Sequence, residues 1–282
     1  MEGIVTEFLE VGDGRLAYDV SGEGPLVVLA HGMGDGRRAY RLLAPRLVAA
    51  GYRVAAVDLR GHGESSTGWP TYTRTDVAAD LIALIRHLGG PAVLVGHSFS
   101  GGAATIAAAR HPELVSAVVE IGPFTRAQNI DFGGLLRNGR HRKGIALLMA
   151  TATLRSIKFW RRYLDHAYPG IRPADYDAYM SDLATALRRP ERMAVVSKMG
   201  TSAPTDAGAQ LPNLTVPALV VMGTLDPDWA DPRAEAEGVV AEMPAGRGVV
   251  TMIDGAGHYP HAQFPAEVAE AMLRFLKDDI RG

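Results

Sequence analysis

Residues 93–102 constrain the fold of this chain more than any other stretch. Their sequence, Val-Leu-Val-Gly-His-Ser-Phe-Ser-Gly-Gly, joins a short apolar run to an alanine-rich helical pattern over 103–110. Such a run is typical of a parallel strand that is buried on both faces. A tight turn between strand and helix would leave Ser98 exposed, beside backbone N–H groups that can stabilise an oxyanion. We therefore predict that Ser98 is a nucleophile.

The composition is that of a globular chain with a large core. Of the 282 residues, 47% are hydrophobic and 21% are charged, which suits one α/β domain with an insertion. The formal net charge of −2 argues against a generally nucleic-acid-binding surface. The chain contains no cysteine, which excludes disulfides, thiol catalysis and cysteine metal sites.

The first ten residues carry acids and lack the basic start and apolar centre of a signal peptide. No apolar run approaches the roughly 20 residues that span a bilayer. We expect a cytoplasmic location and no membrane partner.

Short apolar runs alternate with helical patterns along most of the chain. Two runs, at 6–11 and 15–20, flank Gly12-Asp13-Gly14 and predict an antiparallel hairpin at a sheet edge. The other predicted strands lie at 25–30, 53–57, 92–95, 114–121, 218–222 and 249–253, and the predicted helices at 38–50, 76–87, 103–110, 234–242 and 266–277. This order predicts an α/β fold with a mostly parallel sheet and helices on both faces.

The alternation stops between Pro123 and Pro212, where helical segments such as 143–164 and 175–187 follow one another without a buried strand. We therefore predict a core formed by residues 1–123 and 213–282 and an inserted helical cap over residues 124–212.

The predicted cap is basic. Residues 125–200 hold fourteen Lys and Arg but six Asp and Glu, a formal charge of +8 that leaves −10 for the rest of the chain. One interpretation is that the cluster Arg137, Arg140, Arg142 and Lys143 attracts an anionic substrate or carrier. The alternative is a solvated helix face, which is the commoner role of such clusters.

The segment around Ser98 resembles the G-x-S-x-G nucleophile elbow of the α/β-hydrolase superfamily. Gly96 matches the first glycine, whereas Ser100 replaces the last one. In this superfamily an acid and then a histidine follow the serine along the chain, each after a strand. The resemblance implies that Asp226, in Gly-Thr-Leu-Asp-Pro-Asp, and His258, in Asp-Gly-Ala-Gly-His, complete a triad.

Neighbouring residues leave alternatives open. Asp228 is the nearest alternative acid and His261 the nearest alternative histidine. The resemblance further implies an oxyanion hole made by the backbone N–H groups of Phe99 and of Met33, in His-Gly-Met-Gly. Residues 58–65 resemble the family stretch D-x-R-G-x-G-x-S, which we interpret as structural.

The remaining expectations concern the pocket. We expect three residues to line the substrate pocket: His97 on the core side, and Met149 and Trp160 in the cap. No dinucleotide or P-loop glycine spacing occurs, and no helix carries histidines at metal spacing. We expect neither a cofactor nor a metal.

Taken together, the chain resembles a cap-bearing, esterase-like serine hydrolase. Serine at the nucleophile position argues against haloalkane dehalogenases and epoxide hydrolases, which use aspartate there. The leading expectation is cleavage of a carboxylic ester of a small to medium, largely apolar substrate through an acyl-enzyme. A lactonase, a C–C bond hydrolase and a perhydrolase or haloperoxidase-type enzyme use the same triad. A ligand-sensing signalling protein with slow hydrolysis is the alternative from another class.

Overall fold

An eight-stranded sheet organises residues 5–127 and 137–278, the part of the chain that the computed structural model describes. Its strands are β1 (Glu7–Val11), β2 (Gly14–Ser21), β3 (Leu26–Ala30), β4 (Arg53–Val57), β5 (Ala92–His97), β6 (Val115–Ile121), β7 (Ala218–Gly223) and β8 (Gly248–Ile253). They are ordered β1-β2-β4-β3-β5-β6-β7-β8, and only the β1–β2 and β2–β4 pairs of this sheet are antiparallel. The predicted edge hairpin and mostly parallel sheet are confirmed.

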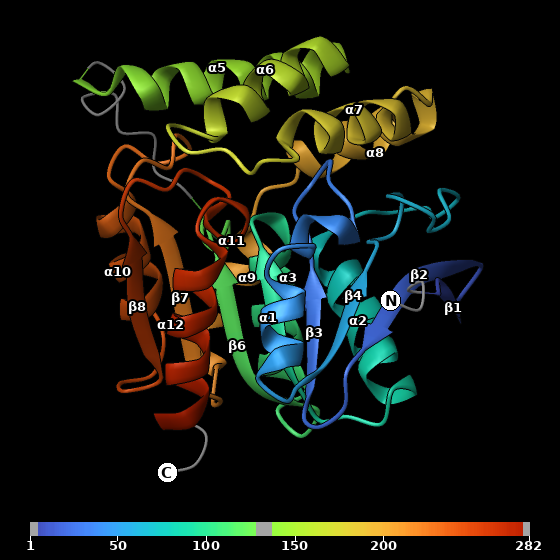
Figure 1. Ribbon diagram of the computed structural model, residues 1–282, viewed down its shortest axis with the longest axis vertical. Coiled ribbons are helices and arrows are strands. Elements are labelled where there is room, and N and C mark those ends of the chain that lie inside the picture. Colours follow the sequence, from blue (N-terminus) through green and yellow to red (C-terminus); the bar gives the residue numbers. More distant parts are fainter. Residues whose placement is uncertain (1–4, 128–136, 279–282) are drawn as a thin grey trace.

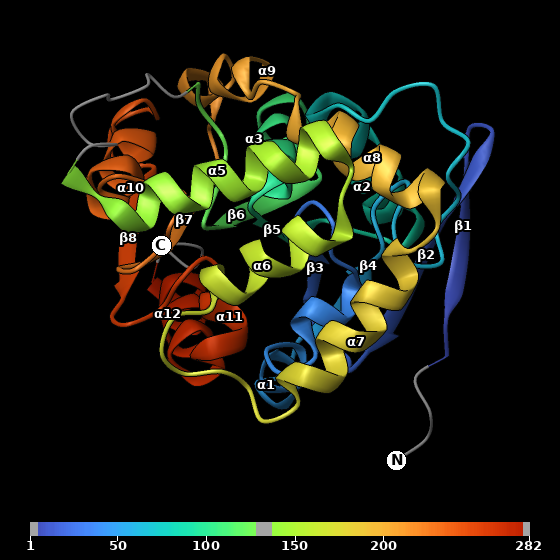
Figure 2. The same cartoon turned by 90° about the horizontal axis from the view of Figure 1, so that it is seen from above.

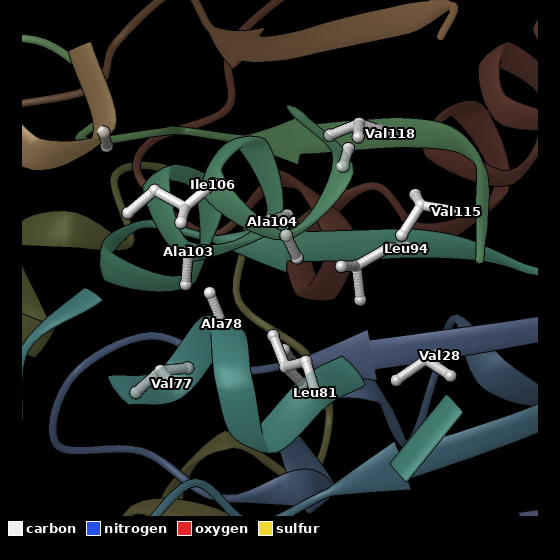
Figure 3. Packing of buried hydrophobic residues seen from close by; sticks show 14 of the residues in the cluster. Val28, Val77, Ala78, Leu81, Leu94, Ala103, Ala104, Ile106, Val115 and Val118 are labelled. Carbon is white, nitrogen blue, oxygen red and sulfur yellow. The ribbon is translucent and has the colours of Figure 1, made fainter. Parts of the chain in front are cut away.

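Helices cover both faces of this sheet (Figure 1). One layer contains α2 (Arg74–His87), α3 (Phe99–Arg110) and α10 (Pro232–Ala241), and the other contains α1 (Ala44–Ala49) and α12 (Pro265–Asp278). Alternate strand residues point to opposite faces of the sheet: Val28 belongs to the apolar cluster that contains Leu81 of α2, whereas Leu29 belongs to the cluster that contains Leu47 of α1. Figure 3 shows Val28 and Leu94 of adjacent strands facing α2 and α3. The predicted α/β class is confirmed.

Within the described residues, four helices form an inserted cap over the carboxyl ends of the parallel strands (Figures 1 and 2). They are α5 (Gly139–Leu154), α6 (Ile157–Ala167), α7 (Tyr176–Leu187) and α8 (Pro190–Gly200). The cap has its own apolar cluster, in which Trp160 and Tyr163 of α6 pack with Leu183 of α7 and Val196 of α8. Tyr259 of the core joins this cluster and anchors the cap to the sheet domain.

Two predicted helices are each divided. The prediction of one helix over 143–164 is wrong, because Arg155 adopts the left-handed conformation with φ 47° and separates α5 from α6. The predicted helix over 38–50 is a short 3-10 helix, η1 (Arg37–Tyr40), followed by α1, which carries Pro45 in its first turn. A proline there lacks the N–H that a continuous helix would need.

Three short elements have no counterpart among the predicted ones: α9 (Thr205–Gly208), η2 (Leu211–Asn213) and α11 (Pro260–Gln263). Helix α9 falls within the predicted cap range but packs on α2 and α3 of the core. Within the described ranges, no helix has both the length and the apolar character needed to cross a membrane.

Candidate active site

Ser98 lies at the sharp turn between β5 and α3. Its backbone adopts φ 54° and ψ −116°, which side-chain-bearing residues rarely occupy. Gly96 permits this turn, because a Cβ there would lie 2.2 Å from the carbonyl oxygen of Ser100. The Ser100 hydroxyl is buried and donates to the His31 carbonyl at 2.6 Å, so the serine that replaces the family glycine ties the turn to the loop after β3.

His258 and Asp226 follow β8 and β7 and meet at the carboxyl edge of the sheet. The His258 Nδ1–H donates to Asp226 Oδ2 at 2.9 Å, and both side chains are buried. Gly122, with φ 51°, leaves the space for this pair, since a Cβ there would lie 3.1 Å from His258 Nδ1. Ser98 and His258 line one cavity, although the hydrogen bonds of the described residues include none between their side chains. In substrate-free enzymes this catalytic contact is often long.

A second carboxylate approaches the same histidine. Asp228 Oδ2 lies 3.2 Å from His258 Nδ1 and accepts a hydrogen bond from the Tyr163 hydroxyl at 2.6 Å. Burial by itself lowers the pKa of His258, but the carboxylates of Asp226 and Asp228 outweigh burial and raise it to about 9. Burial and the charge of Asp226 raise the pKa of Asp228 to about 7. The structure thus brings both candidate acids to His258, where the sequence led us to choose between them.

Asp226, Asp228 and His258 also present potential ligand atoms within 4.8 Å of one another, a spacing that a metal ion could use. The hydrogen bonds to Asp226 and from Tyr163 already engage these atoms. An imidazole whose Nδ1–H is held by a carboxylate keeps Nε2 available as a base, so the arrangement favours proton transfer.

Met33, in the loop after β3, and Phe99, the first residue of α3, both line the cavity. Within the described part of the chain, neither of their backbone N–H groups donates to a protein acceptor. Both are therefore free to bind an oxyanion.

Two buried histidines hold the loop that carries Met33. His62 Nε2 accepts from the Gly34 N–H, and His31 Nε2 accepts from the Leu59 N–H, each at 3.0 Å. Burial lowers the pKa of His31 to about 4 and that of His62 to about 3, so both rings are neutral acceptors at neutral pH. Residues 58–65 thus contribute structurally, by positioning Met33.

A sequence model described as "Alpha/beta hydrolase family" matches residues 27–271. The chain belongs to the α/β-hydrolase family. Among its relatives is 2-(acetamidomethylene)succinate hydrolase of Mesorhizobium japonicum, 29% identical over an alignment of 274 positions that covers 93% of this chain and 92% of the relative. Epoxide hydrolase A of Mycobacterium tuberculosis is 28% identical over an alignment of 308 positions that covers 93% of this chain and 94% of that enzyme.

Solved structures agree with this assignment. The crystal structure of E-2-(acetamidomethylene)succinate hydrolase superimposes with a TM-score of 0.74 at 26% identity, covering 98% of this hydrolase and all of that chain. The thermophilic esterase from Thermogutta terrifontis superimposes with a TM-score of 0.73 at 23% identity, covering 98% of each chain, which shows the shared fold.

The candidate catalytic cavity, which Ser98 and His258 line, has a volume of about 380 Å³ and lies between the cap and the strand ends. Met149 and Trp160 line it; Met149 is 58% exposed, whereas Trp160 is buried and donates from Nε1 to the Gly34 carbonyl at 3.1 Å. Trp160 also stacks on Tyr163, so α6 contacts both the loop that carries Met33 and the loop that carries Asp228.

Two residues differ from expectation. His97, which we expected to line the pocket, is fully buried outside its lining and donates from Nε2 to the His258 carbonyl at 2.9 Å. Its backbone lies in β5, so its side chain points away from that of Ser98. Arg74, which sequence reasoning did not select, lines the cavity at the start of α2. A cation in the first turn of a helix is electrostatically unfavourable, and this unusual position is the feature of the sequence that could have drawn attention to Arg74.

Proposed function

We propose that this hydrolase cleaves a carboxylic ester through an acyl-enzyme on Ser98, with His258 as the base and Asp226 as the acid that orients it. The observation that carries the proposal is the 2.9 Å hydrogen bond between buried His258 and Asp226, in the cavity that the strained Ser98 also lines. Serine–histidine–acid groups activate a hydroxyl in this way on several unrelated folds.

Acylation follows from these positions. The Ser98 Oγ attacks the ester carbonyl carbon, and its proton passes to His258 Nε2. The carbonyl oxygen becomes an oxyanion that the Met33 and Phe99 N–H groups bind. When the intermediate collapses, the bond between carbonyl carbon and ester oxygen breaks, and His258 returns the proton to the leaving alcohol.

Deacylation repeats the same steps with water. His258 Nε2 accepts a proton from water as its oxygen attacks the acyl carbon. The bond between that carbon and Ser98 Oγ then breaks, the serine recovers the proton, and the acid is released. Asp226 remains ionised throughout and stabilises the imidazolium that forms twice in each cycle.

The cavity supports a small to medium substrate. Its volume of about 380 Å³ is near the lower end of small-molecule sites. Apolar side chains from the cap and from the core, among them Met149, Met199 and Phe124, form much of its wall. This lining suits an apolar acyl or alcohol group.

A panel of p-nitrophenyl esters of increasing acyl length tests the proposal. We expect many turnovers per second with short to medium acyl chains, and a loss of at least about 10⁴-fold in kcat for Ser98→Ala. Ser181→Ala, on the exposed side of α7, is the control and should retain the wild-type rate. EDTA should not change the rate, because each proton transfer uses His258. Turnover of a few molecules per hour, with a ligand-induced rise in melting temperature, would instead support a sensing role.

A further inference from the structure

We propose that Arg74 forms an anion-binding subsite in the catalytic cavity, and that the substrate is an acyl compound that carries a carboxylate near its scissile bond. The inference rests on the proposed hydrolytic function and adds the chemical class of the substrate. It depends on the place of Arg74, on its hydrogen bonds and on the absence of a counter-ion among residues 5–127 and 137–278.

Arg74 is close to the reacting groups. It opens α2, is only 3% exposed and lines the same cavity as Ser98 and His258. Its guanidinium carbon lies 4.2 Å from the centre of the Phe99 ring, and Phe99 is the residue that follows the nucleophile. An anion bound by Arg74 would therefore belong to the substrate molecule that Ser98 attacks.

The hydrogen bonds of Arg74 leave part of the guanidinium unused. Nε donates to the Phe124 carbonyl at 3.1 Å, and Nη1 donates to the Ser202 carbonyl at 3.0 Å. Among the described residues, Nη2 has no acceptor, yet it is not one of the fully enclosed atoms that lack a partner. Because Arg74 lines the cavity, we infer that Nη2 reaches this space.

No carboxylate in the described part of the chain lies within ion-pair distance of Arg74. Asp206 contributes at longer range and accepts from Thr75 Oγ1 at 3.0 Å. Arg60 is different: it is similarly buried, but its Nε lies 2.7 Å from Asp80 Oδ2. Within the described residues, Arg60 thus has a counter-ion, whereas the hydrogen bonds of Arg74 go to neutral carbonyls.

A buried cation without a counter-ion is unfavourable, because desolvation is not compensated. Burial lowers the pKa of Arg74 to about 10, so the side chain is still charged at neutral pH. A substrate carboxylate would supply the missing charge and accept from the unused N–H groups, in the geometry that guanidinium and carboxylate share. The apolar wall near Met199 and Ala152 would hold the rest of the molecule.

A purely structural role is the alternative. Arg74 joins the segments at Phe124 and Ser202, which flank the inserted helices, and in this role it would only hold them together. The two roles predict different results. A structural tether would affect all substrates by the same factor, whereas an anion subsite would affect only those that carry a carboxylate.

The test compares matched pairs of methyl esters by proton release. Monomethyl succinate, glutarate and adipate are each paired with the neutral ester in which an isopropyl group replaces the carboxylate. We expect wild-type kcat/KM to favour the anionic ester of at least one pair by about tenfold or more. Arg74→Met should reduce this preference by about 10- to 100-fold.

Arg192→Met is the matched control. Arg192 is also buried and donates to a carbonyl, that of Ser65 at 2.8 Å, but it lies outside the catalytic cavity. Its substitution should leave the preference unchanged. The proposal is overturned if the wild type favours no anionic ester, or if Arg74→Met lowers both members of a pair equally. If Arg74→Met does not fold, the wild-type preference alone decides.

A binding measurement separates this proposal from the proposed function. If no ester is cleaved, the hydrolytic proposal fails, and the melting temperature is then measured with free succinate, glutarate and adipate. A rise in the wild type that Arg74→Met abolishes would support the anion subsite. No rise with any of the three would overturn it.

Discussion

Replacing Asp228 with asparagine should shift the acidic limb of the pH–rate profile to lower pH. His258 must be neutral to accept the Ser98 proton, so activity depends on its pKa. The Asp228 Oδ2 lies 3.2 Å from His258 Nδ1, where its negative charge stabilises the imidazolium. Asparagine keeps the shape and can still accept from the Tyr163 hydroxyl, but it removes this charge.

The size of the shift follows from the two carboxylates. They raise the pKa of His258 to about 9 from its ordinary 6.5, although burial acts in the opposite direction. One opposite charge at this separation shifts a pKa by about 1 to 3 units. Because the charge of Asp226 raises the pKa of His258 more than the charge of Asp228 does, we expect the lower part of this range. A fall of about 1 to 2 units corresponds to about 1.4 to 2.7 kcal/mol.

The measurement is kcat/KM for a short neutral ester between pH 5.5 and 10. In the wild type, the rate should rise with pH towards about 9, because the neutral fraction of His258 rises. In Asp228→Asn it should level off earlier and at a lower plateau, since the transition-state imidazolium loses one stabilising charge. Asp254→Asn, which removes an exposed acid on the loop before His258, should leave the limb in place. The reasoning would be refuted if the acidic limb of Asp228→Asn had its midpoint within about 0.3 pH units of the wild-type midpoint, or above it.

Two further predictions concern the sheet edge and the core. Gly122→Ala should lower kcat about tenfold or more, since its Cβ would lie 3.1 Å from His258 Nδ1 and 3.3 Å from Asp226 Oδ2. Gly246→Ala imposes a similar positive φ with nothing within 4 Å, and should affect only the melting temperature. The melting temperature of Glu120→Gln should exceed that of the wild type by more at pH 8 than at pH 5. Burial raises the pKa of Glu120 to about 7 from 4.5, so wild-type stability falls by about 3 kcal/mol as pH rises through this range.

The sequence predicted those parts of the molecule that depend on local pattern. Apolar runs identified the strands, and Gly96 together with the small residues after Ser98 identified the turn, because only small side chains fit where a strand and a helix approach closely. The loops of Asp226 and His258 followed from strand order. Parallel strands bring their carboxyl ends to one edge, so residues far apart in sequence could be placed together.

The remaining features depend on contacts between distant segments. Asp228 meets His258 because Tyr163 of the cap holds its carboxylate, and no periodicity in the sequence encodes that pairing. The break at Arg155 has no glycine or proline to mark it. The first-turn position of Arg74 is a weak signal by itself, and its role emerges only when Phe99 and Ser202 are seen beside its guanidinium. Charged side chains that act across elements are thus the least predictable part of this site.

Labelling with a fluorophosphonate tests most directly whether Ser98 is the nucleophile. The enzyme is treated with the reagent, its intact mass is measured, and the adduct is mapped by peptide mass spectrometry. We predict one adduct per chain, on Ser98, that is absent in Ser98→Ala and forms much more slowly in Asp226→Asn, where the histidine loses its orienting charge. An adduct on any other residue, or undiminished labelling of Ser98→Ala, would contradict the central claim.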